Sequence, residues 1–93
     1  MSVRIVFPAQ FADLIGADSV SVEAQTVGEA LRRLTDTHAA LASLVWPRDG
    51  SRTELNPVIV VFLNNHDIRG LKGLATPVRT DDELMVISAV EGG

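Results

Sequence analysis

The sequence contains no cysteine. That absence excludes disulfides, thiolate catalysis and cysteine-ligated metal sites, so any sulfur chemistry must use a sulfur atom that is added to the chain. Positive charge is also scarce, because 8 Lys and Arg stand against 12 Asp and Glu for a net charge of -4, and no basic cluster offsets this balance. A phosphate backbone would be repelled, which argues against nucleic-acid binding.

Long apolar runs are missing as well. The longest run, Val58 to Leu63, is far too short to cross a bilayer, and the N-terminal residues lack the apolar region of a signal peptide. We therefore expect a cytoplasmic protein without a membrane partner. The 93 residues, 46% hydrophobic and 22% charged, predict a single globular domain.

Apolar alternation predicts the strands at the N-terminal end. Val3 to Phe7 alternates until Pro8 removes a backbone donor, and Ser19 to Val22 gives a second, short alternating stretch. The simplest connection between them is a hairpin across Pro8 to Asp18.

A helix is predicted to begin at Val27 and to run to about His38. Thr26 and Glu29 form a capping-box pattern, in which the Thr hydroxyl accepts from the N–H of Glu29 and the Glu carboxylate reaches back to the N–H of Thr26. Apolar residues then recur with helical spacing. A shorter helical segment is expected around Leu41, Leu44 and Val45, followed by a polar loop that Trp46 anchors to the core.

The C-terminal half predicts three further strands. Val58 to Leu63 is apolar on both faces, so it is either buried on two sides or has one face free to dock a partner. Asp67 to Arg69 is short and strand-like, Leu71 and Leu74 resemble core anchors, and Leu84 to Ala89 forms the last strand.

These elements predict an α+β domain of the β-grasp (ubiquitin-like) type. Its mixed sheet would have four to five strands packed on one main helix, with the first and last strands as a parallel pair. We expect residues 1–90 to form this domain and residues 91–93 to form a flexible reactive tail.

The end of the chain resembles the ubiquitin-like sulfur-carrier family. The segment GLATPVRTDDELMVISAVEGG, Gly73 to Gly93, has the acidic turn, apolar strand and terminal Gly-Gly of that family at the same spacing. The family includes the small subunit of molybdopterin synthase, the thiamine-pathway carrier and a cysteine-biosynthesis carrier. The NNHDIR stretch from Asn64 to Arg69 looks most like the last of these.

Three residues depart from the family pattern. Asp81 stands at a usual turn glycine, which Asp can replace because its short polar side chain tolerates left-handed backbone. Ser88 and Glu91 stand where Pro and Ala are common, which leaves the activating enzyme and the acceptor open.

The resemblance implies a reaction at Gly93. A C-terminal carboxylate has a pKa of about 3.5, so it is ionised and resists attack until an oxygen becomes part of a leaving group. In the family, a ubiquitin-activating-like adenylyltransferase and sulfurtransferase uses ATP and Mg to adenylate the terminal glycine, and sulfur then displaces AMP. Gly93 would become a thiocarboxylate, with Gly92 as a spacer without a Cβ. The chain would bind no cofactor itself.

Six other residues are candidates for partner binding, and four of them have a plainer alternative. The acidic turn could meet a basic patch on the activating enzyme or be merely solvated, and Arg69 could bridge to an acceptor enzyme or keep an edge strand from aggregating. Val90 and Glu91 precede the reacting end. The set is Arg69, Asp81, Asp82, Glu83, Val90 and Glu91. His38 and His66 lack the spacing of zinc ligands, so no metal site is expected.

Three functions compete at this point. The first is a protein cosubstrate, not itself an enzyme, that donates sulfur to a cysteine synthase-like acceptor. The second is the small subunit of a molybdopterin synthase, in a stable complex with the large subunit. The third is a ubiquitin-like modifier or interaction module.

Overall fold

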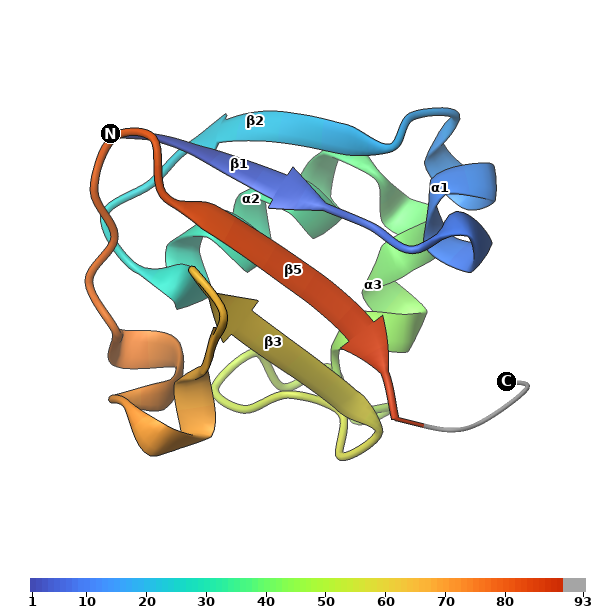
Figure 1. Ribbon diagram of the computed structural model, residues 1–93. Coiled ribbons are helices and arrows are strands. Elements are labelled where there is room, and N and C mark those ends of the chain that lie inside the picture. Colours follow the sequence, from blue (N-terminus) through green and yellow to red (C-terminus); the bar gives the residue numbers. More distant parts are fainter. Residues whose placement is uncertain (90–93) are drawn as a thin grey trace.

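The computed structural model describes residues 1–89, which form a five-stranded mixed sheet with α2 and α3 packed on one face (Figure 1). Within residues 1–89, the other face of the sheet carries no helix. The elements in chain order are β1 (Ser2–Val6), α1 (Ala9–Ile15), β2 (Ser19–Glu23), α2 (Val27–Thr37), α3 (Ala39–Val45), β3 (Ile59–Leu63), β4 (His66–Asp67), the 3-10 turns η1 (Ile68–Gly70) and η2 (Gly73–Ala75), and β5 (Glu83–Ser88). This is the predicted α+β, β-grasp architecture.

The strand order is β2-β1-β5-β3-β4. β1 and β5 run parallel with Val6 opposite Met85, and the other neighbouring strands are antiparallel. The predicted parallel pairing of the first and last strands is therefore confirmed. Because β5 lies between β1 and β3, the last strand of the chain occupies the centre of the sheet.

The α2 helix supplies most of the helical contribution to the core. Its apolar stripe, Val27, Ala30, Leu31 and Leu34, is fully buried against the sheet. The Thr26 hydroxyl accepts from the N–H of Glu29 at 3.1 Å, which confirms the predicted cap.

The second half of the predicted capping box is wrong in one detail. The Glu29 carboxylate accepts at 2.7 Å from the N–H of Gln25, not from that of Thr26. Residues 25–27 are tied to residues 76–78 by two backbone hydrogen bonds, Val27 N–H to the Thr76 carbonyl and Val78 N–H to the Gln25 carbonyl. This tertiary bridge sets which amide faces the carboxylate, and a local motif cannot specify it.

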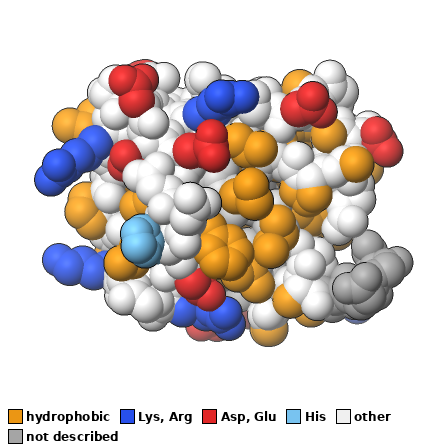
Figure 2. Space-filling model, viewed as in Figure 1, with side chains coloured by type: hydrophobic (Ala, Val, Ile, Leu, Met, Phe, Trp, Pro, Cys, Tyr) orange, Lys and Arg blue, Asp and Glu red, His pale blue; other side chains and the backbone are white. Residues whose placement is uncertain are grey.

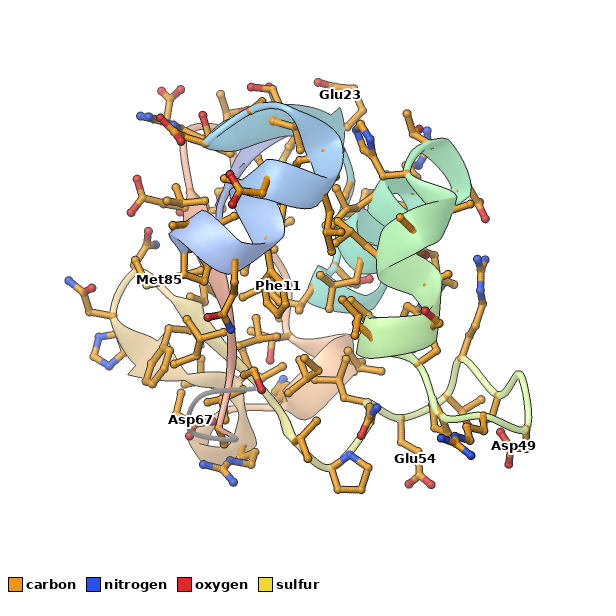
Figure 3. All side chains as sticks on the ribbon, turned by 90° about the vertical axis from the view of Figure 1, so that its right-hand side faces the viewer. Phe11, Glu23, Asp49, Glu54, Asp67 and Met85 are labelled. Carbon is orange, nitrogen blue, oxygen red and sulfur yellow. The ribbon has the colours of Figure 1, made fainter. Side chains whose placement is uncertain are left out.

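The connection between β1 and β2 is a helix, and the predicted simple hairpin is wrong. β1 and β2 do pair antiparallel, but α1 stands between them, preceded by Pro8 and ended by Gly16 in the left-handed conformation (φ 75). Phe11 is buried and lies between α1 and α3 in Figure 3. The burial of Phe11 stabilises a seven-residue helix that would be marginal in isolation.

The segment after β3 differs from its prediction in two ways. Asn64 and Asn65 turn the chain with positive φ, and only His66–Asp67 continues as strand, since the Asp67 carboxylate accepts from the N–H of Arg69 and starts a 3-10 turn. That turn buries Ile68 and leaves Leu71 45% exposed, so Leu71 is not a core anchor. Leu74 is half-buried against the core, as expected.

The α3 helix and the loop after it agree with the sequence. Trp46 is 3% exposed, and its indole N–H donates to the Thr35 hydroxyl at 2.9 Å. The predicted anchoring of the loop by Trp46 is confirmed, and it runs through a buried hydrogen bond to α2.

Candidate functional site

The C-terminal tail starts from the centre of the sheet. β5 ends at Ser88, and the N–H of Ala89 donates to the Val58 carbonyl at 2.6 Å. The backbone is thus held against the start of β3 up to the last described residue. Gly92 and Gly93, the predicted reactive end, and Val90 and Glu91 lie outside the described residues.

The acidic turn lies at the other end of β5. Asp81 has the left-handed φ of 73 expected for a residue that replaces glycine, and its N–H donates to the Ser2 carbonyl at 3.0 Å. The Asp82 carboxylate accepts from the Arg79 N–H at 2.8 Å and from the Asn64 side chain at 3.0 Å. Both carboxylate oxygens of Asp82 therefore stabilise the turn.

The structure places this turn far from Ala89, the last residue that it describes. β5 has six residues, so its two ends are separated by about 17 Å. Figure 1 shows the turn beside the N-terminus, at the far end of β5 from Ala89. A partner that holds the tail would have to cover the full length of β5 to reach Asp81 and Asp82.

Glu83 lies in the sheet, whereas Arg69 lies in the 3-10 turn η1. Glu83 is exposed on the helix-free face, opposite Arg4 in the β1–β5 register. Arg69 lies past the short edge strand β4 and forms an ion pair with Asp67 at 2.6 Å. The hydrogen bond from the Arg69 side chain lowers the pKa of the Asp67 carboxyl below its usual 3.8. Arg69 is therefore already engaged within the chain.

An apolar patch covers the centre of the helix-free face, and we call it the sheet patch. Phe62 and Val6 both lie opposite Met85, and Val60 lies opposite Ile87, so five side chains from three strands adjoin. Met85 is 39% exposed and the others are half-buried. Figure 2 shows these side chains as a continuous apolar area with charged groups around it. The sheet patch consists of Val6, Val60, Phe62, Met85 and Ile87.

The sequence identified only part of this surface. The apolar residues on both faces of β3 left open whether its second face is buried. In the structure, Val60 and Phe62 on that face are half-buried, and none of the described helices covers them. Met85 and Ile87 were missed, although they alternate with the buried Leu84 and Val86. Period-two alternation in the last strand was the signal that would have found them.

The described residues do not form a metal site. Residues 1–89 contain no group of three or more His, Asp or Glu side chains placed to hold a metal ion. His38 lies between α2 and α3, and His66 begins β4. None of the helices in the same range is long and apolar enough to span a membrane.

Comparisons with known proteins bear on what the tail does. The sequence profile of the ThiS family matches residues 5–93. A protein of Archaeoglobus fulgidus that is named as a candidate sulfur carrier is 30% identical over 93 residues, which is 100% of both chains.

Two solved structures agree in fold over nearly the whole length. The crystal structure of SAMP1 from Haloferax volcanii superposes with a TM-score of 0.83 at 32% identity and covers 100% of both chains. A chain of the Amycolatopsis orientalis BexX/CysO complex superposes with a TM-score of 0.83 at 27% identity, over 98% of this chain and 99% of that one. With a β-grasp sheet whose central strand leads directly into the C-terminal tail, and a family match that extends to residue 93, this chain belongs to the ThiS family of sulfur carrier proteins.

Proposed function

We propose that this protein carries sulfur as a thiocarboxylate on Gly93 and donates it in the biosynthesis of cysteine or a related sulfur metabolite. One observation carries the proposal: the central strand β5 is hydrogen-bonded up to Ala89, and the family match continues through the four residues that follow. A rigid domain that ends in Gly-Gly suits delivery of a carboxylate into the narrow active site of another protein.

Two steps would convert the carboxylate. First, a Gly93 carboxylate oxygen attacks the α-phosphorus of ATP in the activating enzyme, where Mg binds the phosphates, and pyrophosphate leaves. Next, a sulfur nucleophile at the oxidation level of sulfide attacks the carbonyl carbon, the bond from carbon to the phosphate oxygen breaks, and AMP leaves. The carbon stays at the carboxylate level throughout, and ATP supplies the leaving group.

The protein would act as a cosubstrate in the cytoplasm and would bind no cofactor of its own. Its partners would be a ubiquitin-activating-like adenylyltransferase and a cysteine synthase-like acceptor. The CysO protein of Amycolatopsis orientalis crystallises in complex with BexX, which supports docking of such carriers on a partner. Among the surfaces of the described residues, the sheet patch suits docking best, because it is apolar, is not covered by a described helix and includes the strand that leads to the tail.

Intact-mass spectrometry tests the proposal directly. Protein purified from cells that contain its native activating enzyme should include a species about 16 Da heavier than the acid, since oxygen is replaced by sulfur. Deletion of Gly93 should abolish this species, whereas Leu71→Ala, at an exposed position outside the strands, should retain it. If the heavier species never forms with the enzyme and ATP present, the sulfur-carrier proposal is wrong.

A second candidate is a protein modifier. Its support is the 32% identity to SAMP1, the small archaeal modifier protein 1 of Haloferax volcanii. In that case the Gly93 adenylate would react with a lysine amine, and isopeptide conjugates would appear in place of the thiocarboxylate. The molybdopterin synthase hypothesis stays a prediction, and stable co-purification with a large subunit would favour it.

A further inference from the structure

A small apolar groove lies next to the point where the tail begins. Its volume is about 190 Å³, and it is formed where α1, α3 and β3 meet the end of β5. The remaining lining side chains are two uncharged amides, so none of the described residues that line the groove is charged. Six residues form most of its wall: Phe11, Leu14, Leu44, Val58, Ile59 and Ser88.

Two of these side chains are unusually exposed for their type. Leu14 on α1 is 49% exposed and Val58, just before β3, is 36% exposed. Val58 is also the residue whose carbonyl accepts from Ala89, so the groove adjoins the last residue that the structure describes. Figure 3 looks onto this side of the molecule, with Phe11 between α1 and α3 and Met85 to the left of Phe11.

The groove and the sheet patch lie on opposite sides of the end of β5. Successive residues of a strand face opposite ways, so Ile87 contributes to the sheet patch and Ser88 to the groove. A partner that contacts both surfaces would clamp the strand from two sides. That arrangement would set the direction in which the tail leaves the sheet.

The size of the groove indicates its occupant. Pockets for cofactors and other small ligands usually measure roughly 300–1,000 Å³, which is more than this groove offers. Its uncharged lining also suits a hydrocarbon side chain better than a phosphate or a carboxylate. Residues 90–93 span at most about 14 Å when extended, so an enzyme that encloses Gly93 must come within that distance of Ala89.

We propose that the groove accepts one aliphatic or aromatic side chain of the enzyme that adenylates Gly93. This inference rests on the proposed function, and it adds a second anchoring point on the helix side of β5. The side chain would cover Leu14 and Val58 and would complete the burial of Phe11. The groove would then position the tail, while the chemistry stays at Gly93.

The test is ATP–pyrophosphate exchange by the purified activating enzyme of the same organism, with the concentration of the full-length carrier varied. Leu14→Glu should raise the KM for the carrier about tenfold, because a charge replaces apolar surface that the enzyme would bury in the complex. It should leave kcat at saturation nearly unchanged. Leu14→Ala should raise the KM less. Leu71→Glu is the matched control, since Leu71 is 45% exposed and does not line the groove, and it should behave like the unaltered chain.

Each other outcome has a distinct meaning. If both Leu14 variants are folded by circular dichroism and keep the KM of the unaltered chain, the groove does not contact the enzyme. Self-association that Leu14→Glu abolishes would assign the groove to a second copy, and methyl NMR shifts of Leu14 on deletion of residues 90–93 would assign it to the tail. Either result overturns the inference. No exchange with the unaltered chain would instead overturn the proposed function, and with it this occupant.

Discussion

The hydrogen bond between Trp46 and Thr35 predicts a specific loss of stability. Both residues are buried, at 3% and 2% exposed, and the indole N–H donates to the Thr35 hydroxyl at 2.9 Å. Thr35→Val keeps the shape of the side chain but removes the acceptor. The free energy of unfolding should fall by about 1–3 kcal/mol, since a buried donor is left without a partner. For a domain of this size the Tm should fall by roughly 4–8 °C per kcal/mol.

A double-mutant cycle separates this bond from the other contacts of Thr35. The hydroxyl also donates to the Leu31 carbonyl at 3.0 Å, and Arg52 approaches it at 3.4 Å. Those contacts persist in a Trp46→Phe background, where no indole N–H remains to be stranded. Thr35→Val should therefore lower the free energy of unfolding less in the Trp46→Phe chain than in the unaltered one. The difference between the two losses should be about 1 kcal/mol or more.

Urea unfolding of the four chains, followed by far-UV circular dichroism, provides the measurement. Fluorescence is unsuitable, because Trp46 is the sole tryptophan. Equal costs of Thr35→Val in the two backgrounds, within about 0.5 kcal/mol, would refute the reasoning. The loop after α3 would then be anchored by packing of the indole ring alone.

Three shorter predictions concern the surfaces around β5. Asp81→Gly should raise the free energy of unfolding by up to about 1 kcal/mol, since φ is 73 there and glycine adopts that conformation without strain; urea unfolding that shows a loss would contradict this. Met85→Glu should raise the KM for activation about tenfold with an unchanged unfolding midpoint, and an unchanged KM would remove the docking role of the sheet patch. Asp67→Asn should lower stability slightly at neutral pH. The pKa of folded Asp67 is below the ordinary 3.8, so the stability that the ionised Asp67 carboxylate contributes is present above that value and is lost as pH falls through the folded pKa. Urea titrations should therefore show the free energies of unfolding of the two chains converging in acid.

Local patterns predicted the elements whose stability is local or whose burial follows a clear period. The α2 helix begins after Thr26 as expected, since a side-chain cap and an apolar stripe act within a few residues. β3 and β5 were placed to within one residue by their apolar runs. The predicted left-handed conformation of Asp81 was confirmed for a similar reason, because turn chemistry depends on the residue itself.

The helix α1 was missed because its stability comes from contacts that are distant in sequence. Phe11, Ala12 and Ile15 have helical spacing between Pro8 and Gly16, which was the available signal. Seven residues form a helix here because Phe11 packs against α3, an element more than twenty residues later. The same reason explains Leu71. Because the 3-10 turn begins after Asp67, Ile68 is buried in the core and Leu71 is exposed.

The sequence by itself led to the chemistry that we propose for this protein. Without cysteine, and with Gly92-Gly93 after an apolar strand, it left one reacting group to propose, and the reactivity of a terminal carboxylate does not depend on the fold. Only the tertiary structure decided which surfaces surround Ala89, the last described residue. Strand pairing placed β5 in the centre of the sheet, gathered Met85, Phe62 and Val6 into one patch, and set the groove beside Ala89. These surfaces join residues far apart in the chain, and hydrophobic burial brings them together only when the whole domain folds.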